Sequence, residues 1–141
     1  MQLKLTRREH LLPHENSAVN AGFSDYNAEQ GQPGTRTPVA LAAYDETNRF
    51  VGGLDGYLFF DYLTVSRLWV AASARRQGLG TLFMDAAEKL ARQAGCVGST
   101  LSTYDFQART FYERLGYTVF GTLPNNPRGH ERFFMAKVLS D

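Results

Sequence analysis

One stretch decides how this chain folds: Leu68-Trp69-Val70-Ala71-Ala72-Ser73-Ala74-Arg75-Arg76-Gln77-Gly78-Leu79-Gly80-Thr81. Its first part is rich in β-forming residues, whereas an amphipathic helix pattern begins at Leu79. Gly78 and Gly80 stand where the strand pattern passes into the helix pattern. A helix N-terminus that follows glycines presents unpaired backbone N–H groups and the positive end of the helix dipole. The stretch therefore predicts a strand, an anion-binding turn and a helix.

The turn has further groups that suit a phosphate ligand. Arg75 and Arg76 can neutralise a diphosphate, and Thr81 adds a hydroxyl donor. Taken alone, such a turn also fits a plain strand-to-helix connection with surface arginines. Two more specific motifs do not match, because the P-loop requires Gly-Lys-Ser/Thr and the dinucleotide fingerprint requires a small residue where Phe83 stands. A nucleotide-binding protein is therefore disfavoured.

The helix after the turn has the most regular pattern in the chain. We expect it to run from Leu79 to Ala94 and to end at Gly95. Its apolar stripe comprises Leu79, Leu82, Phe83, Ala86, Ala87, Leu90, Ala91 and Ala94. The same periodicity turns Asp85, Glu88, Lys89 and Arg92 outward.

Strand patterns on both sides of this helix predict an α/β fold with a mixed, mostly antiparallel sheet. A hairpin is expected over residues 39–54, and further strands over 61–71, 97–104, 117–123 and 131–139. In the strand at 61–71 the apolar phase slips near Ser66-Arg67, which fits a β-bulge or a strand buried on both faces. A short helix is expected over 106–115, with Asp105 as its N-cap.

The N-terminal patterns are weaker. Leu3 and Leu5 alternate with polar residues and suggest an edge strand, and residues 14–26 suggest a helix. Residues 27–38 contain Gly31, Pro33 and Gly34, and we interpret them as a long loop beside a site. The alternative, a linker, would leave pieces too short to be separate domains.

Length, net charge and cysteine count limit the classes of protein to which the chain can belong. The 141 residues fit a single domain over 1–141, and a net charge of +1 argues against a nucleic-acid partner. No apolar run suggests a signal peptide or a membrane span, so we expect a cytoplasmic protein. The one cysteine, Cys96, and the scattered histidines predict no disulfide and no metal site.

Two motifs resemble those of the GCN5-related N-acetyltransferase (GNAT) superfamily. Its acetyl-CoA motif is Gln/Arg-x-x-Gly-x-Gly/Ala after a strand, and Arg75, Gly78 and Gly80 fill these positions. Its second signature is Asn-x-x-Ala-x-x-apolar-Tyr-x-x-x-Gly-Phe/Tyr, and residues 105–117 resemble it with Tyr112 at the tyrosine position. Together the two motifs and the strands around them cover roughly the C-terminal half of the chain.

The resemblance implies a site. The strand before the turn would splay from the next strand, and pantetheine would lie in the gap against the backbone of Leu68, Trp69 and Val70. The resemblance further implies that Arg75 and the main-chain amides of the turn hold the pyrophosphate, and that Tyr112 protonates the departing CoA thiolate. The amides implied are those of Arg76, Gln77, Gly78, Leu79, Gly80 and Thr81.

Tyr112 has two interpretations. A phenol with a pKa of about 10 is protonated at neutral pH and can act as a general acid. However, Tyr112 also lies on the apolar stripe of its helix, where a buried aromatic is expected for packing alone. The flanking motif favours the acid role.

The sequence departs from the family pattern at two points. Asp105 replaces the usual Asn, and because a carboxylate is unfavourable near phosphates, we expect it to act as an N-cap instead of contacting the cofactor. The strand segment 68–72 lacks the carboxylate that deprotonates the amine in many relatives. The substitutes considered are Asp61, Glu46, Asp25 and His130, and an amine that binds in its neutral form needs no base. Residues 125–130 lie near where the family places the acceptor pocket.

These motifs predict an N-acetyltransferase that moves the acetyl group of acetyl-CoA to a primary amine by direct attack, without a metal. The short chain favours a small-molecule acceptor, and a homodimer stays open. The alternative is a GNAT-like module that binds acyl-CoA without turnover.

Overall fold

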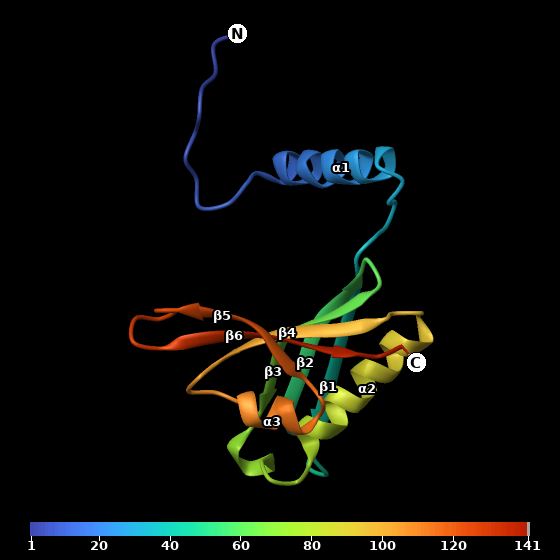
Figure 1. The fold of residues 1–141 in the computed structure, drawn as a ribbon, viewed down its shortest axis with the longest axis vertical. Coiled ribbons are helices and arrows are strands. Elements are labelled where there is room, and N and C mark those ends of the chain that lie inside the picture. Colours follow the sequence, from blue (N-terminus) through green and yellow to red (C-terminus); the bar gives the residue numbers. More distant parts are fainter. Residues whose placement is uncertain (141) are drawn as a thin grey trace. The chain divides into compact units, whose positions relative to one another are not determined.

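The computed structural model describes residues 1–140. The chain divides into two compact units, and the boundary falls between Thr35 and Arg36. Each unit is described by itself (Figure 1). The first unit contains irregular chain and one helix, α1 (Pro13–Glu29). Pro13 begins this helix, since a first-turn residue needs no N–H partner. Glu15 accepts a hydrogen bond from the Leu12 amide at 2.8 Å, which fixes the helix start.

The N-terminal predictions are only partly confirmed. The helix expected over 14–26 exists and is longer at both ends. The edge strand expected at Leu3 and Leu5 is wrong, because both residues lie in irregular chain with their side chains exposed. The irregular segment before the first strand is shorter than the predicted loop, and the boundary between the two units falls within it.

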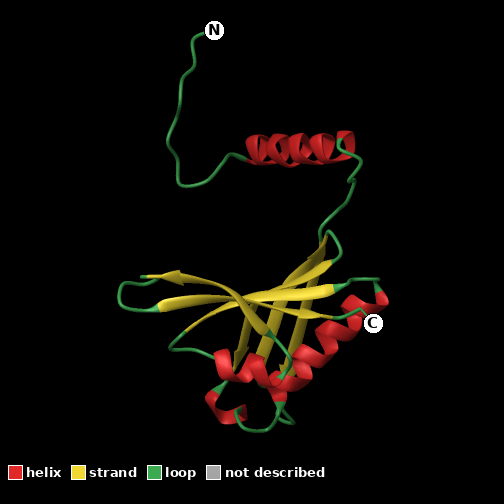
Figure 2. Cartoon of the chain, viewed as in Figure 1, coloured by secondary structure: helices red, strands yellow, loops and turns green. Residues whose placement is uncertain are grey.

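The second unit is built on a six-stranded sheet (Figure 2). Its strands lie in the order β1-β2-β3-β4-β6-β5, and all neighbours are antiparallel except β3 and β4. The predicted mixed, mostly antiparallel sheet is therefore confirmed. The strands are β1 (Thr37–Tyr44), β2 (Phe50–Phe59), β3 (Tyr62–Val70), β4 (Gly98–Tyr104), β5 (Thr118–Pro124) and β6 (Glu131–Val138).

Two helices accompany the sheet, α2 (Leu79–Gln93) and α3 (Arg109–Arg114), with a short 3-10 turn at Ala72–Ala74. The predicted bounds of α2 are nearly right, but its buried face is rotated from the predicted stripe. The predicted stripe members Leu82 and Leu90 are exposed. The prediction that Glu88 faces outward is wrong. The buried side chains of α2 are Phe83, Met84, Ala87, Glu88 and Ala91.

The core lies between α2, α3 and one face of the sheet. Leu63, Met84 and Met135, from β3, α2 and β6, are fully buried at its centre. Burying side chains of this size provides the main favourable free energy of folding. The opposite face of β1, β2 and β3 carries exposed aromatic and charged residues instead.

β3 contains a bulge and leaves its neighbour early. Asp55 of β2 lies opposite Arg67, whereas Gly56 lies opposite Val65, so Ser66 has no partner. This is the bulge predicted from the slip in apolar phase. On its other side β3 pairs with β4 only from Tyr62 to Thr64. Beyond Thr64 the two parallel strands part, as the family resemblance implied.

Gly56 permits the bulge. A Cβ atom at this position would overlap the carbonyl oxygen of Thr64 and crowd Val65. Only a residue without a side chain lets the β2 backbone approach β3 so closely. The bulge therefore depends on Gly56.

We expect Gly56→Ala to lower the free energy of unfolding by about 1–3 kcal/mol, because the added methyl group must push β2 and β3 apart. Gly121→Ala is the matched control, since Gly121 also lies in a strand but its Cβ would meet open space. Urea unfolding followed by circular dichroism measures both variants. Equal stabilities of the two variants would contradict the role assigned to Gly56.

Candidate functional site

The gap between β3 and β4 exposes backbone groups of β3. The Ala71 amide donates to the Val51 carbonyl at 2.8 Å, so Ala71 hydrogen-bonds toward β2. Backbone direction alternates along an antiparallel pair, so Trp69 also bonds toward β2, while Leu68 and Val70 turn their N–H and C=O groups toward the gap. Of the three residues predicted to pair with pantetheine, these two turn backbone groups toward the gap, although the Val70 carbonyl already accepts a hydrogen bond from Arg75.

The turn that follows β3 contains six successive unpaired amides. Within residues 1–140, the backbone N–H groups from Arg76 to Thr81 donate no hydrogen bond to backbone or side chain. The first helical bond of α2 is made by Leu82 to the Gly78 carbonyl at 3.0 Å. Unpaired amides at the positive end of a helix form an anion-binding concavity. The predicted turn residues therefore come together as one such cradle.

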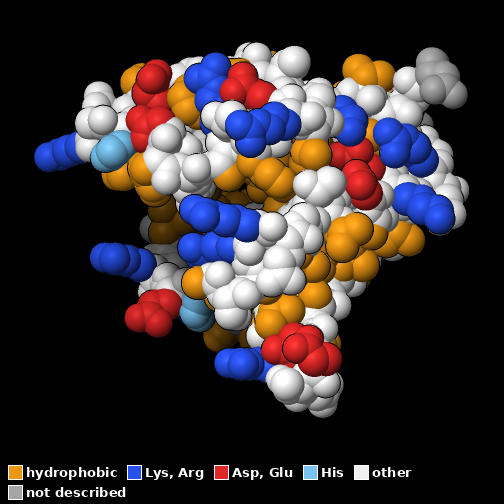
Figure 3. Space-filling view, turned by 90° about the horizontal axis from the view of Figure 1, so that it is seen from below, with side chains coloured by type: hydrophobic (Ala, Val, Ile, Leu, Met, Phe, Trp, Pro, Cys, Tyr) orange, Lys and Arg blue, Asp and Glu red, His pale blue; other side chains and the backbone are white. Residues whose placement is uncertain are grey.

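Two arginines frame this cradle. Arg75 donates from Nε to the Val70 carbonyl at 3.2 Å, which holds its guanidinium at the mouth of the gap. Arg76 has a positive φ of 65° and an exposed side chain. Figure 3 views this end of the molecule, where Lys and Arg side chains project among exposed hydrophobic ones.

The two glycines of the turn have different roles. Gly78 has a φ of 77°, in the left-handed region that favours glycine, and a side chain there would meet open space. At Gly80 a Cβ would lie 3.1 Å from the ring of Phe111. Gly80 therefore lets α3 pack against the start of α2, which brings the helix that carries Tyr112 to the cradle.

The start of α3 corrects one prediction. The helix begins at Arg109 rather than near Phe106, and Asp105 is not its N-cap. The Asp105 carboxylate instead accepts from the Glu131 amide at 2.9 Å and contacts His130 Nδ1 at 2.8 Å. These contacts, the Glu131 amide first, lower the pKa of Asp105. The carboxylate therefore joins the end of β4 to the loop before β6.

Tyr112 is buried, has an uncommitted hydroxyl, and follows the Phe111 that packs on Gly80. Its ring packs edge-on against Phe111 and Tyr117, with centroids 5.1 and 6.0 Å away. Its hydroxyl forms no hydrogen bond within residues 1–140. Burial raises the pKa of Tyr112, so the phenol stays protonated at neutral pH. The side chain can thus donate a proton to a nearby base.

The neighbouring Tyr117 is committed to a buried polar network. Its hydroxyl donates to Glu88 Oε2 at 2.9 Å and contacts Ser99 Oγ at 2.8 Å. Lys137 Nζ lies 2.7 Å from Glu88 Oε1. Burial, above all, raises the pKa of Tyr117, and the Glu88 carboxylate adds to this effect. The network fastens α2 to β4 and β6, and no sequence pattern had indicated it.

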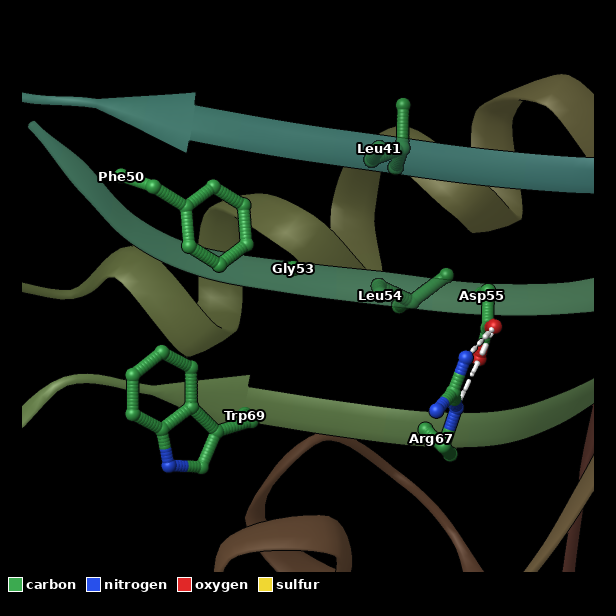
Figure 4. Close-up of a pocket in the computed structure, with 7 residues that line it drawn as sticks. All are labelled: Leu41, Phe50, Gly53, Leu54, Asp55, Arg67 and Trp69. Carbon is green, nitrogen blue, oxygen red and sulfur yellow. Dashed lines mark hydrogen bonds and ion pairs between the residues drawn. The ribbon is translucent and has the colours of Figure 1, made fainter. Parts of the chain in front are cut away.

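A hollow of about 310 Å³ lies on the face of β1, β2 and β3 opposite α2 (Figure 4). We call it the open-face hollow. Its lining includes Phe50, Asp55, Arg67 and Trp69. No sequence pattern indicated this group. The missing signal is the hairpin register, which places Asp55 opposite Arg67 only once the bulge at Ser66 is counted.

Other predicted features have these outcomes. Cys96 is a free, buried thiol whose pKa is raised by burial and by the charge of Asp61, as suits a structural cysteine. In the described part of the chain, no three His, Cys, Asp or Glu side chains gather as a metal site would require. None of the helices in residues 1–140 is long and apolar enough to cross a membrane.

Comparison with known proteins supports the same reading of the motifs. A model of the acetyltransferase (GNAT) family matches residues 4–117. The chain is 40% identical over 114 residues to a blasticidin-S acetyltransferase of Streptomyces morookaense, covering 74% of this chain and 84% of that protein. It is 31% identical over 106 residues to the acetyltransferase Atu2258 of Agrobacterium fabrum, covering 75% and 77%. The crystal structure of an acetyltransferase from Bacillus cereus superposes with a TM-score of 0.80 at 27% identity, covering 94% and 97%.

The fold and these matches define an acyltransferase of the α/β type. The chain belongs to the acetyltransferase (GNAT) family. The predictions that it is an enzyme and an N-acetyltransferase are confirmed. The alternative of a GNAT-like module without turnover is thereby set aside.

We expect Lys137→Met to lower the free energy of unfolding by about 3 kcal/mol, because it removes the nearer cation of the buried Glu88 carboxylate and leaves only the more distant Arg92 at 3.9 Å. Lys89→Met on the exposed side of α2 is the control and should change stability little. Chemical denaturation compares the two. An equally small effect of both would mean that the Glu88 contacts add little to the fold.

Proposed function

We propose that this enzyme transfers the acetyl group of acetyl-CoA to a primary amine of a small molecule by direct attack. The row of six unpaired amides from Arg76 to Thr81 is the observation that carries the proposal. The positive ends of these N–H dipoles suit the negative charge of the two CoA phosphates, and Arg75 and Arg76 add neutralising side chains. The gap-facing backbone of Leu68 and the amide of Val70 suit the amide-containing pantetheine arm in the gap beside them.

The chemical step needs no acyl-enzyme. The amine nitrogen attacks the thioester carbon, a C–N bond forms, the C–S bond breaks, and the ammonium proton passes to solvent. The sulfur leaves as a thiolate, and the phenol of Tyr112 supplies its proton. Three features support this role for Tyr112: its burial, its free hydroxyl, and the packing of the neighbouring Phe111 on Gly80.

The small-molecule acceptor is supported by the relative that is named for blasticidin-S. The lone, buried Cys96 fits the reduced, cytoplasmic setting that the sequence predicts. A homodimer, and the absence of nucleic-acid and membrane partners, stay predictions.

We expect Gly78→Val to weaken acetyl-CoA binding at least about tenfold, because a branched side chain would project into the open space before the amides. Isothermal titration with acetyl-CoA measures the loss, and wild-type protein should bind neither ATP nor NAD. Gly95→Val is the matched control, since Gly95 ends the same helix with a φ of 85° and the same open surroundings. If Gly78→Val bound acetyl-CoA with wild-type affinity, the placement of the pyrophosphate at this turn would be contradicted.

We expect Tyr112→Phe to lower kcat about 100-fold while the affinity for acetyl-CoA changes little, since only proton donation to the thiolate is lost. Release of free CoA measures turnover. Tyr117→Phe is the control: it should lose about 1 kcal/mol of stability but retain turnover in the folded protein, because its hydroxyl serves the Glu88 network. Unchanged kcat in Tyr112→Phe would leave Tyr112 a packing residue.

A further inference from the structure

The open-face hollow lies on the other side of β3 from the core. Gly52 of β2 faces α2, since its Cβ would meet the side chains of Phe83 and Leu79. Gly53, the next residue, faces the opposite side, where its Cβ would lie 3.2 Å from the Phe50 ring. In Figure 4 the rings of Phe50 and Trp69 lie in front of the strands and the α2 ribbon behind them. The hollow therefore lies on the face of the sheet away from the core.

An acceptor amine can approach the gap from the face of the sheet opposite α2. The proposed donor arm lies between β3 and β4, and the α2 side of the sheet is filled by the core. A nucleophile on the opposite face of the sheet can therefore reach the thioester without crossing the core. The side chains of Arg67 and Trp69 project onto that face from the same stretch of β3 whose backbone lines the gap. The open-face hollow thus lies beside the same segment of β3 that borders the gap.

Aromatic rings form one wall of this hollow. Phe50 and Trp69 are nearly parallel, with an interplanar angle of 14° and centroids 6.2 Å apart, and Tyr44 meets Phe50 edge-on. Phe50 and Trp69 are 47% and 52% exposed. Large aromatic groups left half exposed beside a cavity are typical of ligand sites. Their flat faces attract unsaturated rings and cations.

A carboxylate stands at the other end of the hollow. Asp55 accepts hydrogen bonds from Arg67, from Nε at 3.0 Å and from Nη2 at 2.5 Å. These bonds, together with the charge of Arg67, lower the pKa of Asp55, so the carboxylate is ionised at neutral pH. The Arg67 side chain is 82% exposed, and such a pair is weak because water competes for it. Arg67 can therefore give way to another cation.

We propose that the open-face hollow is the acceptor site, and that the acceptor is an amine which also carries a flat ring and a second, cationic group. The ring lies against Phe50 and Trp69, and the cationic group contacts Asp55 in place of Arg67. This inference rests on the proposed function, because it assumes that the acetyl donor occupies the neighbouring gap.

Three matched amines test the charge preference: 4-(aminomethyl)benzamidine, 4-(aminomethyl)benzamide and 4-(aminomethyl)benzoate. They share one reacting amine and one ring and differ only in the charge of the far group. With saturating acetyl-CoA, kcat/KM from CoA release should fall in that order. An equal or reversed order, or no turnover of the amidine by protein that binds acetyl-CoA, would overturn the inference.

Variants assign the preference to residues. Asp55→Asn should lower kcat/KM for the amidine about tenfold, through KM, and leave the amide nearly unchanged. Arg67→Gln should raise kcat/KM for the amidine, because the competing cation is gone; a decrease would contradict the replacement of Arg67 by the acceptor's cation. Glu46→Gln, in the exposed hairpin turn, is the carboxylate control. Unchanged selectivity in Asp55→Asn would contradict the site.

The aromatic wall is tested separately. Phe50→Leu should weaken all three benzylamines but not the saturated analogue 4-(aminomethyl)cyclohexanecarboxamidine, since only flat rings stack. Phe60→Leu is the control, because Phe60 has the same exposure, 46%, and lies in the turn between β2 and β3. If acetyl-CoA binds neither the wild type nor the variants, the proposed function fails. If acetyl-CoA binds but the selectivity among the amines is unchanged by the Phe50 and Asp55 substitutions, only this inference fails.

Discussion

The parting of β3 from β4 after Thr64 is the constraint on which the site depends. A parallel pair that continued to Val70 would satisfy the backbone groups of Leu68 and Val70 and leave no gap. The bulge at Ser66 bends β3 at this point, and bulges increase local twist. Gly56 makes the bulge possible by letting β2 approach the Thr64 carbonyl. The absence of a side chain at Gly56 of β2 therefore helps to open the gap between β3 and β4.

The sequence predicted the features that depend on local pattern and missed those that depend on register. The phase slip at Ser66 indicated the bulge, and the glycine turn indicated the anion site, because each signal lies within a few residues. Glu88 was misplaced because periodicity assigns faces by polarity, while Lys137 and Tyr117, distant in sequence, make a buried carboxylate tolerable. The strand expected at Leu3 failed because alternation alone supplies no partner strand.

Two adjacent tyrosines have different surroundings. Tyr112 and Tyr117 are both buried and their rings touch, yet the Tyr117 hydroxyl is held by Glu88 and Ser99 while that of Tyr112 is free. Turning the Tyr117 hydroxyl toward another acceptor would cost free energy, because the buried Glu88 carboxylate would lose a hydrogen bond. In the proposed mechanism, proton donation therefore falls to the uncommitted hydroxyl of Tyr112. The sequence motif and the hydrogen bonding lead independently to the same residue.

Alternation along a strand explains how one segment can serve both substrates. From Arg67 to Val70, successive residues direct their backbone groups to opposite edges of β3 and their side chains to opposite faces of the sheet. Leu68 and Val70 turn backbone to the gap and side chains to the core, whereas Arg67 and Trp69 direct their side chains to the open face. Donor and acceptor would thus meet at β3 without competing for the same groups. The donor side uses backbone, which tolerates changes in side chain, so acceptor preference can vary through Arg67, Trp69 and their neighbours on β2 while the turn stays the same.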